Sequence, residues 1–117
     1  MMGSKLISFK TAILEPSGYI TAANVTEFQQ ELTKFISAND YSTFLVDMHR
    51  VEFMDSAGLM ALVSAFRLSQ TLNKRFSVCS LAPSVRIIFE LTQLDRAFEI
   101  YETRQAYEIT LGETIAA

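Results

Sequence analysis

VEFMDSAGLMALV, residues 51–63, is the stretch that decides the fold. It begins with the apolar character of a buried strand. It then continues into apolar residues that recur at the spacing of one helix face, namely Leu59, Leu62 and Val63, and Phe66 extends this face beyond the stretch. Between the two parts stand Asp55 and Ser56, whose side-chain oxygens suit the free amides at a helix start. The stretch therefore predicts a strand that runs directly into a helix, with a carboxylate and a hydroxyl at the junction.

Before this stretch, the sequence predicts a hairpin followed by a helix. Residues 6–14 alternate in polarity at their start and predict a strand, 15–18 have turn composition, and 19–21 predict a short returning strand. A helix is expected to begin near Asn24, where Glu27 three residues later completes an approximate capping box.

The remaining segments alternate between strands and helices. They are a strand over 43–48, a second helix that ends near 71–75, a strand over 76–81, a helix introduced by Pro83 and Ser84, a strand over 98–101, and a helix that Thr103 caps and Gly112 ends. Such alternation implies crossover connections between parallel strands. The sequence therefore predicts an α/β fold in a single domain, 1–117, with a mixed, mostly parallel sheet of four to five strands packed with about four helices.

The composition narrows the class of protein. The chain has 117 residues, half of them hydrophobic, and a formal net charge of −3, which argues against nucleic-acid binding. No apolar run approaches the ~18 to 20 residues of a membrane span, and the first residues lack the apolar segment of a signal peptide. One cysteine, Cys79, excludes a disulfide framework and fits a small core residue. We therefore expect a soluble cytoplasmic domain without a membrane or nucleic-acid partner.

Catalytic and cofactor chemistry has little support in the sequence. A single histidine, His49, and a single cysteine do not make a metal-binding cluster of the usual kinds, and His49 lies in a polar segment expected at the surface. Phosphate-binding glycine motifs are absent from the sequence. Ser56 has Gly58 two positions later, but Met54 stands where a hydrolase nucleophile elbow requires glycine. We expect no catalytic residue, no metal, no cofactor and no enzyme activity.

Asp55 and Ser56 leave two interpretations open. In the first, one of these residues caps the helix, and an acid near the positive end of the helix dipole adds to the stability of the helix. Alternatively, Met54, Leu59 and Met60 form an apolar rim around an exposed hydroxyl, as at a partner-binding surface. Two positions of Met60 are also open. Either its side chain is exposed as part of this rim, or the third helix covers it.

The segment FLVDMHRVEFMDSAGLMALV, residues 44–63, resembles the core signature of STAS domains, and specifically of bacterial anti-sigma factor antagonists. SGYIT (17–21) is similar to the family's short second strand. The segment RFSVCSLAPSVRIIFELTQLDRAFEIYET (75–103) is similar to the strand, helix and closing strand that follow the signature. This sequence departs from the family pattern at Thr21, Ala57 and Met60, and these departures bear on the choice of partner more than on the fold.

The resemblance implies a partner-switching mechanism. An antagonist of this family binds an anti-sigma factor that is also a serine kinase, and thereby releases a sigma factor and regulates transcription. The kinase then phosphorylates Ser56, and a PP2C-type phosphatase resets the chain, which acts as a monomer or weak dimer. The contacts are expected from Met54, Asp55, Ser56, Ala57, Gly58, Leu59 and Met60. The alternative is a STAS scaffold subunit of a signalling or lipid-transport complex that does not switch.

A phosphate on Ser56 would act by charge. It adds about −1.5 to −2 charge at a helix start, where the dipole and free amides tolerate it, so the fold is expected to survive. Beside Asp55 the added charge gathers on one small patch. A partner shaped to cover a neutral hydroxyl would then bury that charge at a cost of roughly several kcal/mol.

Overall fold

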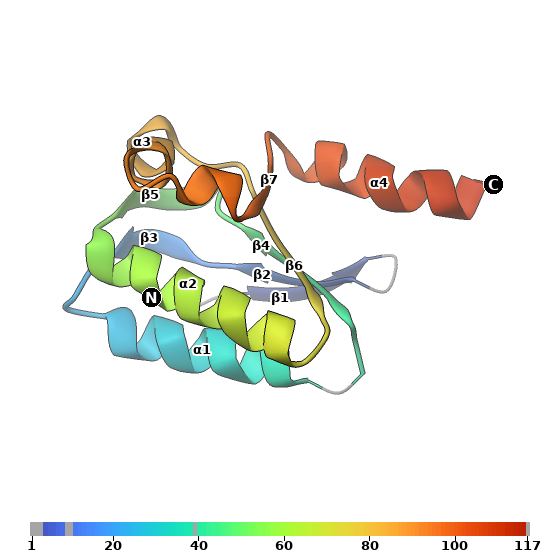
Figure 1. Ribbon diagram of the computed structural model, residues 1–117, viewed down its shortest axis with the longest axis horizontal. Helices are drawn as coiled ribbons and strands as arrows, with labels where there is room; N and C mark the ends of the chain where they lie inside the picture. Colours follow the sequence, from blue (N-terminus) through green and yellow to red (C-terminus); the bar gives the residue numbers. More distant parts are fainter. Residues whose placement is uncertain (1–3, 9–10, 39, 117) are drawn as a thin grey trace.

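The computed structural model describes residues 4–8, 11–38 and 40–116, with side chains described for 11–38 and 40–111. Its main sheet has five strands in the order β1-β2-β4-β6-β7. These strands are β1 (Ser4–Ser8), β2 (Thr11–Glu15), β4 (Thr43–Asp47), β6 (Arg75–Cys79) and β7 (Glu99–Tyr101). β1 pairs antiparallel with β2, and the other neighbours pair in parallel. The mixed, mostly parallel sheet of the predicted α/β fold is therefore confirmed (Figure 1).

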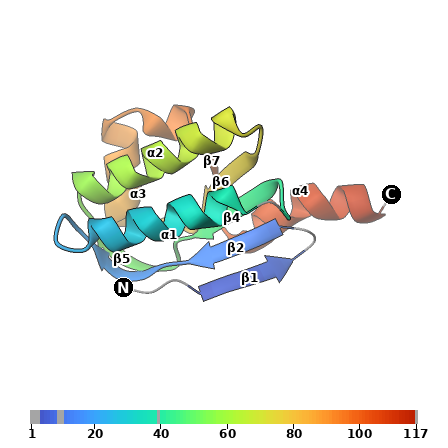
Figure 2. The ribbon, with the colours of Figure 1, turned by 90° about the horizontal axis from the view of Figure 1, so that it is seen from below.

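Three helices cover one face of this sheet. They are α1 (Val25–Ser37), α2 (Ser56–Thr71) and α3 (Pro83–Leu91), and α1 and α2 lie side by side (Figure 2). Alternate strand residues point into the core beneath them, including Leu14, Phe44, Val46, Phe76 and Val78. The predicted inner face of α2 is confirmed, because Leu59, Leu62 and Val63 are buried and Phe66 packs against the same core.

The fourth helix, α4 (Arg104–Ala116), packs on the opposite face of the sheet. Tyr107 from α4 is fully buried against Ile13, Leu45 and Cys79, which alternate with the core residues along β2, β4 and β6. Beyond this contact α4 extends away from the sheet toward the C-terminus (Figure 1). The predicted cap of this helix is confirmed, since the Ala106 amide donates to Thr103 Oγ1 at 3.0 Å.

The opening hairpin was predicted in the wrong place. The expected strand over 6–14 covers most of β1 and most of β2, and these two strands form the hairpin with each other. The next strand, β3 (Ser17–Ile20), does not return along β2 but pairs in parallel with β5 (Arg50–Met54) in a separate two-stranded sheet. Only Pro16 separates β2 from β3, and one residue is too short for a hairpin turn.

The predicted start of α1 near Asn24 is confirmed, but one predicted cap and one predicted helix end are wrong. Asn24 precedes α1, but its side chain does not cap the helix: its Oδ1 accepts from the Thr21 amide at 2.9 Å and its Nδ2 donates to Tyr19 O at 2.8 Å. At the other end of the chain, α4 continues past Gly112. A glycine inside a helix costs only about 1 kcal/mol relative to alanine, so it does not by itself end the helix.

A short 3₁₀ helix over Leu94–Arg96, which periodicity did not predict, connects α3 to β7. Among the residues that the structure describes, none of the helices is both long enough and apolar enough to span a membrane.

Candidate functional site

The first turn of α2 packs directly on the two-stranded sheet. A Cβ atom at Gly58 would lie 2.7 Å from Met54 Cγ and 2.9 Å from Ile20 Cγ2, distances that a side chain does not tolerate. The Asp55 amide donates to Ile20 O at 3.1 Å at the same junction. Glycine at position 58 therefore lets the helix start approach β3 and β5 closely, which fixes where Ser56 is presented.

Asp55 is the N-cap of α2, so the interpretation that one of the two polar residues caps the helix is confirmed. Its Oδ1 accepts the amides of Ala57 at 3.0 Å and Gly58 at 3.1 Å, and its Oδ2 accepts the amide of Ala22 at 3.0 Å. The Ala22 amide contributes most to lowering the pKa of Asp55 below its ordinary value, followed by the Gly58 amide. The carboxylate therefore remains ionised through the neutral range beside Ser56.

Ser56 is the first residue of α2, and its side chain is exposed. Asp55 caps the helix, so Asp55 and Ser56 have different roles and the hydroxyl of Ser56 is not needed for the cap. Met60 lies one helical turn further along the same outward surface and is 52% exposed, so the alternative in which the third helix covers it is wrong.

The expected apolar rim is wrong for Met54 and Leu59. Met54 is completely buried and Leu59 lies on the inner face of α2, so both support the site from below instead of surrounding it. Gly58 is also buried, and Ala57 is partly buried. Of the seven residues predicted for partner contact, Ser56 and Met60 are exposed to solvent.

Two aromatic residues near the junction were missed. Tyr19 and Phe53 are paired neighbours in β3 and β5, their ring centroids lie 6.1 Å apart, and both side chains are exposed. The pairing register shifts just before Tyr19, which leaves Glu52 and Phe53 exposed in succession and returns Met54 to the core. An irregularity of this kind has no signature in the periodicity, so the sequence predicted only a buried strand there.

A second polar cluster lies where β2 and β4 end. Asp47 is 3% exposed, and Arg104 Nε donates to its Oδ2 at 2.9 Å while Arg104 Nη2 donates to Glu15 Oε2. His49 is exposed, as predicted, and its Nδ1 lies 2.9 Å from Asp47 Oδ1. Burial raises the pKa of Asp47, but the hydrogen bonds from His49 and Arg104 outweigh it and the net pKa lies below the ordinary value.

This cluster is the group of described residues with metal-ligand geometry. The ligand atoms of Glu15, Asp47 and His49 lie within 4.8 Å of one another. However, the Arg104 guanidinium bridges both carboxylates, so a cation supplied by the chain itself already lies between them. The arrangement serves as an ion-pair clamp that holds the start of α4 against β2 and β4. An adjoining cavity of about 520 Å³ is lined by Asp47, His49, Ser80, Thr103, Arg104, Gln105 and Glu108.

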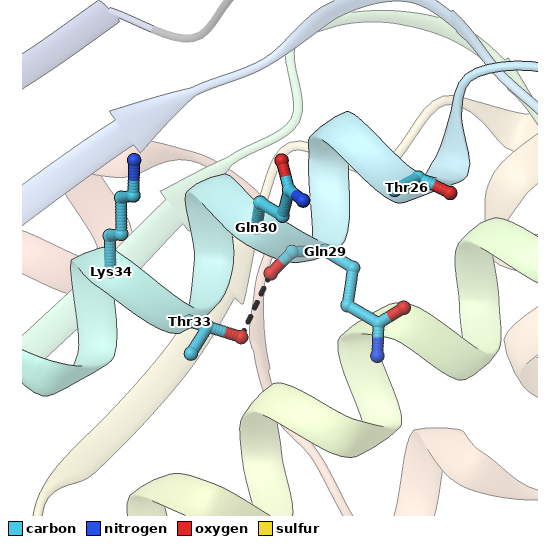
Figure 3. Close-up of a pocket in the computed structure, with 5 residues that line it drawn as sticks. All are labelled: Thr26, Gln29, Gln30, Thr33 and Lys34. Carbon is cyan, nitrogen blue, oxygen red and sulfur yellow. Dashed lines mark hydrogen bonds between the residues drawn. The ribbon is translucent and has the colours of Figure 1, made fainter.

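A further hollow of about 530 Å³ lies along α1 (Figure 3). Its described lining is Thr26, Gln29, Gln30, Thr33 and Lys34, all exposed residues of this one helix. The Thr33 hydroxyl donates to Gln29 O at 2.9 Å, and Lys34 supplies the single charge among these five side chains. None of these five described side chains is a carboxylate, an imidazole or a thiol. Cys79, for its part, is fully buried, and burial raises its pKa to about 12, so it is no nucleophile.

Comparisons with known proteins identify the family of this chain. A family model described as the STAS domain matches residues 7–107. BtrV of Bordetella bronchiseptica, named as a candidate anti-sigma factor antagonist, is 25% identical over 89 residues, which cover 76% of each chain.

Solved structures share the fold. A candidate anti-sigma factor antagonist from Thermotoga maritima has a TM-score of 0.85 at 21% identity and covers 93% of each chain. The anti-sigma factor antagonist SpoIIAA of Bacillus has a TM-score of 0.69 at 16% identity in both its unphosphorylated and its phosphorylated form. These two structures cover 92% of this chain, and this chain covers 94% and 98% of theirs. The chain belongs to the STAS domain family.

Proposed function

We propose that this protein is an anti-sigma factor antagonist of the cytoplasm that switches partners by phosphorylation of Ser56. In its unmodified form it binds an anti-sigma factor that is also a serine kinase, and this releases a sigma factor for transcription. The kinase phosphorylates Ser56 and the complex dissociates, and a PP2C-type phosphatase restores the serine. The chain acts by binding and not by catalysis.

The observation that carries the proposal is the exposed hydroxyl of Ser56 at the first position of α2. A kinase must reach the acceptor oxygen, and the neighbouring Asp55 performs the capping, so modification of Ser56 removes no hydrogen bond from the helix cap. The names of BtrV and SpoIIAA support the same class of function, and SpoIIAA has a phosphorylated form.

The proposed contact surface is narrower than the whole 54–60 segment. A partner would touch Ser56 and Met60 on α2, together with Ala22 and Ala23 of the turn that Asp55 holds nearby. Met54, Gly58 and Leu59 shape this surface from the core side. Methionine suits such a role because its flexible, polarizable side chain adapts to a partner.

The switch would rest on electrostatics. Asp55 already carries a negative charge, and phosphorylation of Ser56 adds about −1.5 to −2 more on the adjacent residue. Burying that charge against a surface shaped for a hydroxyl would weaken the complex. A loss of ~4 kcal/mol in binding free energy corresponds to about a thousandfold in affinity, which is sufficient for a switch without refolding.

The test is incubation with the kinase and ATP, followed by intact mass and site mapping. One added phosphate on Ser56, abolished by Ser56→Ala and retained in Ser64→Ala, is the expected result. Ser64 is a matched control because it is an exposed serine two turns further along α2. Stable binding of a signalling or transport complex without any phosphorylation would instead identify a scaffold.

A further inference from the structure

The Asp55 carboxylate joins two segments that lie far apart in the chain. Oδ1 faces the amides of Ala57 and Gly58 in α2, whereas Oδ2 faces the amide of Ala22, 33 positions earlier. The backbone of Asp55 adds a second link, because its amide donates to Ile20 O at 3.1 Å. An ordinary N-cap satisfies only its own helix, so the bond to Ala22 is additional to capping.

The segment that Asp55 holds is itself a closed turn. The Asn24 amide donates to Thr21 O at 3.0 Å, the Ala23 amide donates to Thr21 Oγ1 at 3.2 Å, and the Thr21 amide donates to Asn24 Oδ1 at 2.9 Å. These bonds make residues 21–24 a local unit. The Ala22 amide points out of that unit and reaches across to the start of α2.

Carboxylate chemistry suits this position better than any other polar side chain. Both oxygens of an ionised Asp are acceptors, so one side chain serves donors on two sides. Asn would keep an acceptor for the α2 amides but would turn its NH₂ group toward the Ala22 amide. Ser would cap α2 with a single oxygen and would be too short to serve both segments.

We infer that Asp55 is a positioning residue of the partner-binding surface: its carboxylate holds the 21–24 turn beside Ser56, so that a partner meets both segments as one preformed surface. This inference rests on the proposed function for the identity of the partner. The geometric part, that Asp55 fixes the turn, does not depend on any partner.

The first test is amide hydrogen exchange in Asp55→Asn, with Asp95→Asn as the control that removes one negative charge from an exposed acid elsewhere. Asn is as good an N-cap as Asp, so the thermal unfolding transition is expected to remain close to that of the wild type. The Ala22 amide is expected to exchange about tenfold faster, as one charge-assisted hydrogen bond is lost. Unchanged exchange at Ala22 would overturn the inference.

The second test is the affinity for the anti-sigma factor, with Ala22→Pro as a variant that leaves Asp55 untouched. Proline removes the Ala22 amide hydrogen, and it is common at the second position of a four-residue turn such as 21–24. Asp55→Asn and Ala22→Pro are each expected to weaken binding about tenfold, whereas Asp95→Asn binds like the wild type. Wild-type affinity in both variants would overturn the positioning role. If the wild type itself binds no anti-sigma factor, the proposed function fails, and with it the partner role of Asp55.

Discussion

A Cβ atom on Gly58 would stand 2.7 Å from Met54 Cγ, so the start of α2 and the end of β5 are packed as closely as a glycine permits. Ile20 closes the other side, with its Cγ2 at 2.9 Å and its carbonyl oxygen at 3.2 Å from the same point. The site that presents Ser56 is therefore built from three chain segments in mutual contact and not from a mobile loop.

Gly58→Ala is expected to destabilise the protein even though alanine is the better helix former. The propensity gain of about 1 kcal/mol is outweighed by overpacking, which typically costs about 1–3 kcal/mol. Because two contacts of the added Cβ would be shorter than 3.0 Å, we expect a cost of about 2–3 kcal/mol and so a net loss of about 1–2 kcal/mol. The free energy of unfolding in urea measures this. Ser64→Ala on the exposed side of α2 is the control and is expected within about 0.5 kcal/mol of the wild type. A Gly58→Ala protein as stable as wild type would contradict the close packing.

Arg104→Gln is expected to destabilise the protein by removing the cation that bridges Glu15 and the buried Asp47. We expect a loss of about 2–4 kcal/mol in the free energy of unfolding, below the full value for a buried pair because Arg104 is partly exposed and His49 still bonds Asp47. The matched control is Arg86→Gln, whose partner Glu102 is exposed and lies 3.6 Å away, and here a change below about 1 kcal/mol is expected. Equal effects of the two variants would contradict the clamp.

The same cluster makes stability depend on acid pH. Burial raises the pKa of Asp47, but the bonds from His49 and Arg104 lower it further, so the folded pKa lies below the ordinary 3.8. A lowered pKa means that the stabilisation is fully present above pH 3.8 and is lost as the pH falls through the folded pKa. In Arg104→Gln, burial acts with less opposition, so the acid loss of stability is expected to begin at a higher pH. Urea unfolding from about pH 2 to about pH 7 tests this, and parallel pH profiles for the two proteins would refute it.

A phosphate on Ser56 is expected to point away from the chain. A helix start leaves its first amides without partners inside the helix. Here the Asp55 amide donates to Ile20 O, and the Ala57 and Gly58 amides both donate to Asp55 Oδ1. Phosphorylation is therefore expected to shift the amide proton resonances of Ala57 and Gly58 only slightly, whereas the same modification of Asp55→Ala shifts them strongly downfield. Large shifts in the phosphorylated wild type would mean that the phosphate displaces Asp55 from the helix cap.

The sequence predicted the elements with strong local signals. The helical spacing of Leu59, Leu62 and Phe66 and the proline at position 83 located α2 and α3, because these signals act within a few residues. The pairing of β3 with β5 was not predictable in this way, since it joins segments about 33 positions apart and leaves no local periodicity. Pro16 looked like part of a turn, and only the fold shows that the chain continues past it into the second sheet.

The site, like the fold, was predicted only where its features depend on neighbouring residues in the sequence. Residue type and position identified Asp55 and Ser56 at a helix start, because capping is local chemistry. The bond from Ala22 to Asp55 depends on the tertiary arrangement, and the burial of Met54 depends on a register irregularity in β5. Both therefore lay beyond what the sequence pattern indicates.

The phosphorylation switch is tested most directly by comparing the affinity of the anti-sigma factor kinase for the unmodified protein and for the protein phosphorylated at Ser56. We predict tight binding of the unmodified form and a loss of about a thousandfold on phosphorylation, with the two forms unfolding at similar temperatures. Equal affinities for the two forms would contradict the switch, and so would a loss of affinity that accompanies unfolding of α2.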